Sequence, residues 1–298
     1  MNFSRTLLLS SVLVTGGSAN AGSAGDIALK ELWETGPGLK DPESVVYDPK
    51  RDVLYVSNVN GTATEKDKNG FIAKVSVQGE ILEPQWVTQE LSAPKGMALF
   101  EDKLYVADID QLVEIDLAVG RVSQRWRASG AVFLNDVAVD AQGSVYVSDM
   151  MTNTLYRLQT GQFAPWVTSP ELEGPNGLYV ERGRLLVATW GPIKEGFSTE
   201  RGGRLKSVSL ADRSLSDLGD GRPVGNLDGL EADGRGGYLV TDWMAGRVLH
   251  VRPNGEFEVL LTAQQGTADH EYLAERALLL IPMMKADKLV AYRLERLR

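Results

Sequence analysis

The feature of the sequence that most constrains its fold is a segment that recurs six times along the chain. Each copy starts with Pro, Leu or Ala followed by a polar residue. A short apolar run, a turn and a second apolar run come next. The copy that begins at Leu227 reads LDGLEADGRGGYLVTD. Short apolar runs separated by Gly, Asp and Asn are typical of antiparallel β-meanders. One meander cannot bury both of its faces, so each copy needs neighbours like itself.

The spacing of the copies predicts how they assemble. We call the polar second residues the anchor residues, and they are Glu43, Lys95, Asn135, Asn176, Asp228 and Asp269. They are separated by 52, 40, 41, 52 and 41 residues. Repeats of about 40–50 residues with four strands each are typical of β-propellers. The sequence therefore predicts an all-β fold, a six-bladed β-propeller of four-stranded antiparallel blades.

The two ends of the chain are expected to close this ring. Apolar or Trp-containing segments that fit outer strands precede later anchors at 85–87, 124–126, 165–167 and 258–261. A further such segment, which would serve the sixth blade, lies at 29–33, near the start of the chain. We therefore expect the N-terminal strand to complete the blade formed by residues 270–295, which leaves no exposed strand edge at the seam.

Two long connections, 58–70 and 190–203, are expected between the second and third strands of the first and fourth blades. In an up-and-down meander this connection lies at the same end as the start of strand one. The anchor residues should therefore share one face of the ring with both long loops, around the mouth of the central channel. The loops fit either tolerated surface insertions or a lid over the channel.

The start of the chain has the pattern of an export signal. Arg5 is followed by an apolar stretch over 6–14 and by Ala19-Asn20-Ala21, which fits a cleavage site after Ala21. The apolar stretch is too short to span a membrane, so membrane insertion is not expected. The sequence thus predicts a signal peptide over 1–21 and a single propeller domain over 22–298, in the periplasm or secreted.

Composition excludes several classes of function. The formal net charge is −9, which disfavours nucleic acids and anionic membranes as partners. The chain has no Cys, so it forms neither disulfides nor thiolate sites. No Gly-x-Ser-x-Gly elbow, phosphate-binding Gly loop or His-Glu-x-x-His motif occurs. Nothing in the sequence indicates an oligomeric state.

Four anchor residues form a candidate metal site: Glu43, Asn135, Asn176 and Asp228. Two carboxylates and two amide carbonyls are hard oxygen donors, which suit Ca²⁺, Mg²⁺ or Mn²⁺. A dication would also relieve the repulsion between carboxylates crowded at the channel mouth. We expect Ca²⁺, with Mg²⁺, Mn²⁺ or Zn²⁺ as alternatives. The competing interpretation is that Asn-Gly, Asp-Gly and Asn-Asp pairs only form turns.

The chain resembles the senescence marker protein / gluconolactonase / luciferin-regenerating enzyme family of six-bladed propellers. The matching pieces are Pro42-Glu43, Leu134-Asn135-Asp136, the PNGL stretch at 175–178 and the LDGL stretch at 227–230. The resemblance implies that Glu43, Asn176 and Asp228 hold a divalent cation. It also implies that Asn135 contacts the metal, its water or the substrate.

The activity that this resemblance implies is hydrolysis of a lactone or small ester. The cation would polarise the carbonyl, and Asp228 is the expected general base. Asn135 is the second residue assigned to catalysis. A non-catalytic propeller that binds a ligand or protein around a structural metal ion is the alternative.

Five further residues are expected to line the substrate site. Lys95 has no counterpart in the family pattern; it could pair with Glu43 or Asp269, bind a substrate carboxylate, replace part of the metal's charge or extend to solvent. Asp269 and His270 are expected beside the site, and His270 fits a polar lining residue better than a catalytic base. Trp190 and Trp243 could form an apolar wall or serve packing.

Three Asp residues follow second strands in nearly identical settings. Asp108, Asp149 and Asp242 end the stretches YVAD, YVSD and LVTD. Because Asp side chains readily accept hydrogen bonds from nearby backbone N–H groups, we expect these three to stabilise turns.

Overall fold

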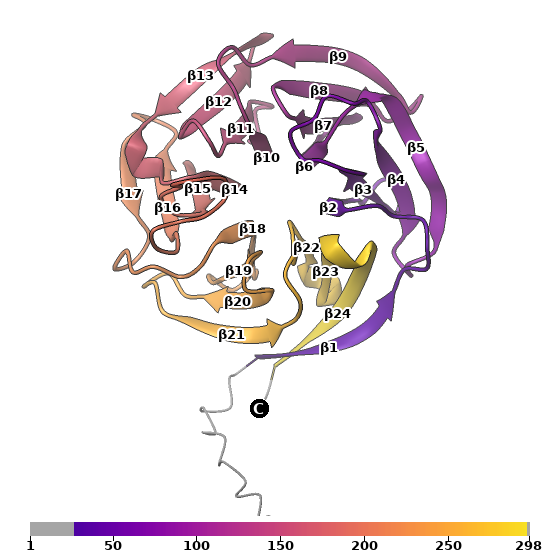
Figure 1. Ribbon diagram of the computed structural model, residues 1–298. Helices are drawn as coiled ribbons and strands as arrows, with labels where there is room; N and C mark the ends of the chain where they lie inside the picture. The colour runs from indigo at the N-terminus through magenta and orange to yellow at the C-terminus, as the bar shows by residue number, and fades with distance from the viewer. Residues whose placement is uncertain (1–26, 297–298) are drawn as a thin grey trace, which may run out of the picture.

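The computed structural model describes residues 27–296, which form six four-stranded antiparallel sheets. The sheets stand radially around a central channel (Figure 1). The predicted six-bladed propeller is therefore confirmed. The expected signal peptide over 1–21 lies outside the described residues.

Each blade runs from an innermost first strand to an outer fourth strand. The strands of blades one to three are β2 (Pro42–Asp48), β3 (Val53–Asn58), β4 (Gly70–Ser76), β5 (Ile81–Leu91), β6 (Pro94–Phe100), β7 (Lys103–Asp108), β8 (Gln111–Asp116), β9 (Arg121–Arg127), β10 (Leu134–Val139), β11 (Val145–Asp149), β12 (Thr154–Gln159) and β13 (Gln162–Thr168). Those of blades four to six are β14 (Pro175–Glu181), β15 (Arg184–Thr189), β16 (Leu205–Ser209), β17 (Leu215–Asp217), β18 (Leu227–Ala232), β19 (Tyr238–Asp242), β20 (Arg247–Val251), β21 (Phe257–Thr262), β22 (Glu271–Leu273), β23 (Leu278–Met283), β24 (Lys288–Arg296) and β1 (Ile27–Glu34).

Helical structure in residues 27–296 is confined to short 3₁₀ turns. These are η1 (Pro170–Leu172), η2 (Ala274–Arg276) and η3 (Met284–Ala286). None of the helices in this part of the chain is long and apolar enough to cross a membrane.

The ring is closed by the two ends of the described chain. β1 pairs antiparallel with β24 from Ile27 opposite Arg296 to Glu34 opposite Val290. Beyond the ladder, Thr35 donates its N–H to Leu289 O at 2.9 Å. The predicted closure by the N-terminal strand is therefore confirmed, and blade six holds strands from both ends of the sequence.

Apolar clusters fill the space between neighbouring blades. Tyr55 and Ile72 of blade one, for example, pack in one buried cluster with Leu104 and Val106 of blade two. A Tyr on the second strand also meets a Trp on the fourth strand in three blades. The pairs are Tyr55–Trp86, Tyr105–Trp126 and Tyr146–Trp166, with ring centroids 4.7, 6.4 and 5.1 Å apart. The Trp side chains of the predicted outer strands thus pack against Tyr rings of their own blades and stabilise them.

Every innermost strand of blades one to five carries an irregularity at its anchor residue. In blade five, Leu227 lies opposite Asp242, but Leu230 lies opposite Val240, so the strand has one extra residue. Blades one to four show the same register shift. Such a bulge leaves one N–H out of the ladder and re-aims a side chain. In three blades a hydroxyl on strand two accepts this N–H. Ser57 accepts from Ser44, Ser148 accepts from Asp136, and Thr241 accepts from Gly229.

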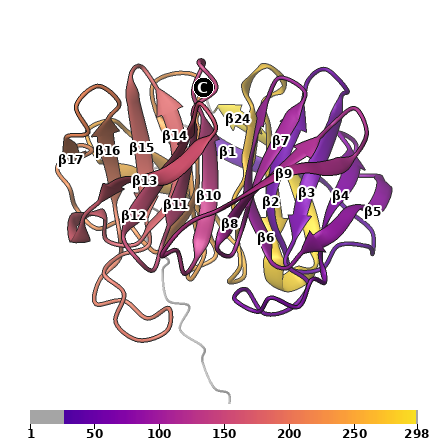
Figure 2. The ribbon, with the colours of Figure 1, turned by 90° about the horizontal axis from the view of Figure 1, so that it is seen from above.

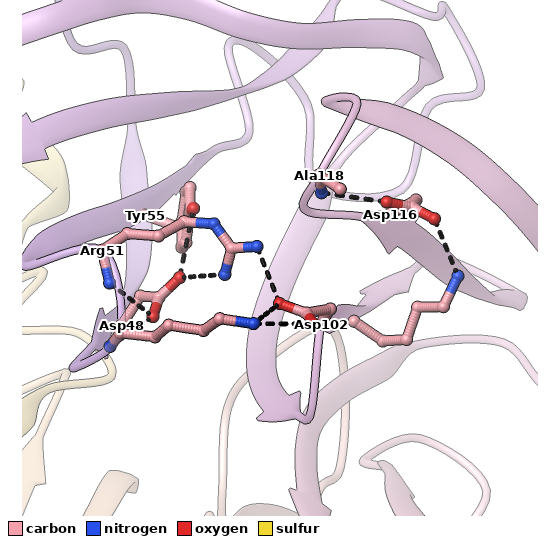
Figure 3. A network of polar contacts seen from close by, with 8 residues as sticks. Asp48, Arg51, Tyr55, Asp102, Asp116 and Ala118 are labelled. Atoms are coloured by element: carbon pink, nitrogen blue, oxygen red, sulfur yellow. Dashed lines mark hydrogen bonds and ion pairs between the residues drawn. The ribbon is translucent and has the colours of Figure 1, made fainter.

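Charged side chains connect blades one and two at the end of the ring opposite the anchor residues. Arg51, in the turn between β2 and β3, donates to Asp48 at 2.9 Å and to Asp102 of the next blade at 2.8 Å (Figure 3). Lys50 also donates to Asp102, at 2.7 Å. Partly exposed pairs of this kind stabilise weakly, by about 0–1 kcal/mol each, so they align the blades rather than hold them together.

The structure places Asp108, Asp149 and Asp242 at the last position of their second strands, where each accepts backbone N–H groups from adjoining loops, as expected. Asp149 is fully buried and accepts N–H groups from Val132 at 2.8 Å and Phe133 at 3.2 Å, just before β10. It also accepts N–H groups from Met151 and Thr152 at 3.1 and 3.3 Å. Its carboxylate therefore fixes the segment that leads into the anchor residue of blade three.

Replacing Asp149 tests this role. Asp149→Ala removes the acceptor of four backbone N–H groups, and we expect unfolding free energy to fall by about 2–4 kcal/mol because buried donors are left without partners. Asp149→Asn keeps one acceptor oxygen, so its free energy of unfolding should fall by less than that of Asp149→Ala. Urea unfolding of both variants provides the measurement. Equal stability of Asp149→Ala and the parent protein would contradict the assignment.

Candidate functional site

A cavity of about 310 Å³ lies at the end of the channel where the innermost strands begin. Four predicted metal ligands, from blades one, three, four and five, line it, and so does Lys95 from blade two. The ligands are Glu43, Asn135, Asn176 and Asp228, all at most 6% exposed. Residues up to 185 positions apart in sequence therefore meet in one cavity.

Two oxygens of this set are buried without a hydrogen-bond partner. They are Oε2 of Glu43 and Oδ1 of Asn176. The amide nitrogen of Asn176 donates to Leu227 O at 3.0 Å, which fixes the amide and leaves its oxygen free. Buried polar atoms normally have partners, so orphaned oxygens on two anchors that line the same cavity require an explanation.

Glycine after an anchor residue allows the innermost strands to come close together. A Cβ on Gly177, directly after Asn176, would lie 2.0 Å from Asp228 O. A Cβ on Gly229, after Asp228, would lie 2.6 Å from Nδ1 of His270. The Asn-Gly and Asp-Gly pairs are thus required by the narrowness of the channel, and the turn-forming interpretation does not account for them.

Burial and like charge both act on the carboxylates of the cavity. Burial, and then the Asp228 carboxylate, raise the pKa of Glu43 well above its usual range, while the Lys95 ammonium opposes this. The pKa of Asp228 is also raised well above its usual range, by burial and by Asp269. The protein alone supplies too little positive charge here to compensate two buried carboxylates.

Lys95 is buried in the cavity wall, so the expectation that it could extend to solvent is wrong. Its side chain is 1% exposed, and Nζ donates to Ala63 O and to Ala93 O, both at 3.0 Å. The ammonium also lies 4.5 Å from the centroid of the Phe133 ring. Burial lowers the pKa of Lys95 to about 8, although Glu43 and Asp108 counteract this effect. The backbone of the 58–70 loop holds the ammonium because a buried cation needs acceptors.

A second set of lining residues follows a repeat position at which the sequence reasoning found only Trp190 and Trp243. In five blades the residue directly after strand two is apolar and lines the cavity. We call this set the apolar ring, and it consists of Val59, Met150, Trp190, Trp243 and Met284. In blades one, three, four and five this residue donates its N–H to the carbonyl of the residue just before strand one, at 2.7–3.1 Å, and Met284 of blade six donates to Gly266 O at 2.8 Å. Aligning the copies on the end of strand two would have revealed it.

Both long loops contribute to the same cavity. Gly61 and Ala63 of the first loop and Phe197 of the second line it. In the side view the loops extend from one end of the ring (Figure 2). Phe197 packs edge-on against Phe133, with centroids 5.4 Å apart, and against Trp190 at 6.2 Å. The loops therefore form part of the cavity wall.

Asp269 and His270 lie deeper in the channel and do not line this cavity. Asp269 accepts a hydrogen bond from Ser44 Oγ at 2.6 Å and donates its N–H to Glu43 O at 3.0 Å, so it joins blade six to blade one. His270 is 1% exposed, and burial lowers its pKa to about 3. The sixth copy differs because its anchor precedes β22, whereas the others lie inside strand one.

Further carboxylates below the cavity bridge adjacent innermost strands, and sequence reasoning did not single them out. Asp136 accepts the N–H of Leu178 of blade four at 2.6 Å. Glu271 of blade six accepts the N–H of Tyr47 of blade one at 2.9 Å. Innermost strands share no ladder with their neighbours. Side chains therefore make these connections between blades.

The model of the SMP-30/gluconolactonase/LRE-like region matches residues 42–267. The chain belongs to this family. The matched region begins with β2 and includes all four candidate metal ligands, but ends before Asp269. Family membership agrees with the motif resemblance, and the ring-closing β1 lies outside the match.

Solved structures share the fold at low sequence identity. A gluconolactonase from Xanthomonas campestris is 15% identical with a TM-score of 0.65, covering 91% of each chain. A streptogramin B lyase is 10% identical with a TM-score of 0.63, covering 90% of this chain and 98% of the other. Virginiamycin B lyase from Staphylococcus aureus is 13% identical with a TM-score of 0.61, covering 90% and 99%. No curated protein matches the sequence.

The electrostatics of the cavity predict an unusual effect of Glu43→Gln. In the presence of a chelator this change removes a buried, partnerless carboxylate from beside Asp228. We expect unfolding free energy to rise by about 1–2 kcal/mol, since an uncompensated buried charge is costly. The control, Glu31→Gln on the exposed surface of β1, should change nothing. Denaturant unfolding measures the stability of both variants. A lower free energy of unfolding in Glu43→Gln would contradict the prediction that its buried carboxylate destabilises the protein.

Proposed function

We propose that this protein is a metal-dependent hydrolase of lactones or small esters. The observation that carries the proposal is the convergence of Glu43, Asn135, Asn176 and Asp228 on one cavity with two oxygens orphaned. Membership of a family that includes gluconolactonase supports the reaction class. The export leader expected at 1–21 would place the activity outside the cytoplasm.

The residues present fit a divalent cation. No cluster of three or more His, Cys, Asp or Glu side chains within 27–296 is placed to hold a metal ion. The ligand set would therefore be mixed, with carboxylates from Glu43 and Asp228 and amide oxygens from Asn135 and Asn176. Two carboxylates balance the charge of a dication, and an all-oxygen set favours Ca²⁺ over the softer Zn²⁺, with Mg²⁺ and Mn²⁺ as alternatives.

The reaction proposed is addition of water to the ester carbonyl. When bound, a divalent cation supplies a Lewis acid that polarises this carbonyl. Asp228 takes a proton from the attacking water, whose oxygen bonds to the carbonyl carbon. The ring C–O bond then breaks, and the leaving oxygen receives the proton to give a hydroxy acid. Asn135 orients the water or the substrate through its amide.

The rest of the cavity supports this chemistry by position and polarity. The polar groups lie in the anchor positions, while the apolar ring covers the wall. A wall of this kind excludes bulk water from the reacting carbonyl and strengthens electrostatic interactions at the anchors. Lys95, whose ammonium is held by two carbonyls, keeps a fixed positive charge beside the carboxylates.

Metal binding is tested by thermal melting with and without Ca²⁺. Ca²⁺ at 100 times its dissociation constant should stabilise the parent protein by about 2.7 kcal/mol, and a chelator should remove this gain. Asn176→Leu should lose most of the gain, because it removes one oxygen ligand. Asn254→Leu, in a surface turn of blade five, is the matched control. Identical melting with Ca²⁺, Mg²⁺, Mn²⁺, Zn²⁺ and chelator would exclude the metal site.

The base assigned to the reaction is tested by Asp228→Asn. We expect turnover of a lactone to fall by about 10²–10⁴-fold, the usual contribution of a general base. Calorimetry on the same variant must still detect Ca²⁺, so that loss of the base is separated from loss of the metal. Full turnover in Asp228→Asn would remove Asp228 as base. A parent protein that binds Ca²⁺ but hydrolyses no lactone or ester would instead be a binding propeller.

A further inference from the structure

We infer that the substrate is a lactone or ester with an apolar alkyl or aryl substituent, and not a polyhydroxylated sugar lactone. That the substrate contains an ester bond rests on the proposed function. That its substituent is apolar is a separate inference, which follows from the composition and hydrogen bonding of the cavity wall.

The apolar ring surrounds the space above the anchor residues. Five of the six blades place Val59, Met150, Trp190, Trp243 or Met284 there. In blade two the equivalent residue, Ile109, is buried in a cluster with Val59 and Met284. A repeat position filled by apolar side chains all around the axis leaves Lys285, beside Trp243, as the polar side chain at this level of the wall.

Aromatic side chains from the long loop of blade four extend the same surface. Trp190 donates its indole N–H to Phe197 O at 2.9 Å, so its single polar group is already satisfied. Phe197 itself is 42% exposed at the rim of the cavity. A large apolar side chain that remains exposed beside a cavity is a typical contact for a ligand.

The charged and amide side chains that line the cavity are five anchor residues and Lys285. Two protons of the Lys95 ammonium are donated to backbone carbonyls. Lys285 lies 5.7 Å from the centroid of the Trp243 ring. A sugar lactone carries a hydroxyl on nearly every ring carbon, and most would face the apolar ring without a partner. Unpaired buried hydroxyls disfavour binding, whereas an alkyl or aryl group gains from the same wall.

A neighbouring hollow could take the far end of a longer substituent. It shares Phe133 and Met150 with the cavity and is further lined by Val132, Met151 and Ile193. Val132 is 53% exposed, which keeps this hollow open to solvent. Apolar side chains thus continue past the cavity between the two long loops, alongside Thr64, Asn153 and Lys194.

The test compares three six-membered lactones that differ only in substituents. They are δ-valerolactone without a substituent, δ-decalactone with a pentyl group, and glucono-δ-lactone with hydroxyls. Each kcat/KM is divided by the uncatalysed hydrolysis rate constant, because the three differ in intrinsic reactivity. One buried methylene adds up to about fourfold, so δ-decalactone should exceed δ-valerolactone by at least about 10-fold. Glucono-δ-lactone should be the poorest of the three.

Two variants show whether the apolar wall causes the preference. Phe197→Ala and Trp243→Gln should each lower the ratio of kcat/KM for δ-decalactone to kcat/KM for δ-valerolactone by about 5–10-fold. Leu82→Ala, at a similarly exposed apolar residue on β5, is the control and should leave this ratio unchanged. A circular dichroism melt of each variant establishes that it is folded.

The outcomes separate the two proposals. Preference for glucono-δ-lactone overturns the inference and leaves the hydrolase intact. If no lactone is hydrolysed, the proposed hydrolase function is wrong. Equilibrium binding of δ-decalactone and glucono-δ-lactone then decides the ligand class. Tighter binding of δ-decalactone supports the apolar ligand; equal or weaker binding overturns it.

Discussion

The pairing of β1 with β24 is the interaction on which the remainder of the structure depends. Neighbouring blades share no ladder, so the hydrogen-bonded pair of β1 and β24 within blade six is the strand ladder that joins the start of the ring to its end. Without β1, that blade would keep three strands and expose the edge of β24. The cavity needs blade one and blade five at a fixed separation, because Glu43 and Asp228 come from them. Closure therefore determines whether the site exists.

One backbone unit, repeated around an axis, produces two levels of side chains with opposite character. The bulge at strand one directs a polar anchor into the cavity, and the residue after strand two adds an apolar side chain above it. Buried charge is costly unless paired, and Glu43 and Asp228 bear that cost within the cavity. Stability is supplied elsewhere, by the clusters between blades and by buried acceptors such as Asp149. This division leaves the anchors available for a ligand.

The fold and much of the cavity could be predicted because turn residues and apolar runs recur in phase. Glu43, Asn135, Asn176 and Asp228 occupy equivalent places in their copies, and the ring brings equivalent places together. The prediction for Asp269 and His270 fails at the same step, since the sixth copy enters its strand differently and places them below the cavity. Lys95 could not be placed from its own repeat, because its acceptor Ala63 belongs to the loop of another blade.

By itself the sequence determined the number of blades, the order of the strands, the closing strand and the shared face of anchors and loops. These follow from local periodicity, which is written along the chain. Only the tertiary structure decided which oxygens lack partners, where the Lys95 ammonium is held and how the apolar ring encloses the cavity. Those properties depend on distances between side chains of different blades, and such distances are set when the ring closes.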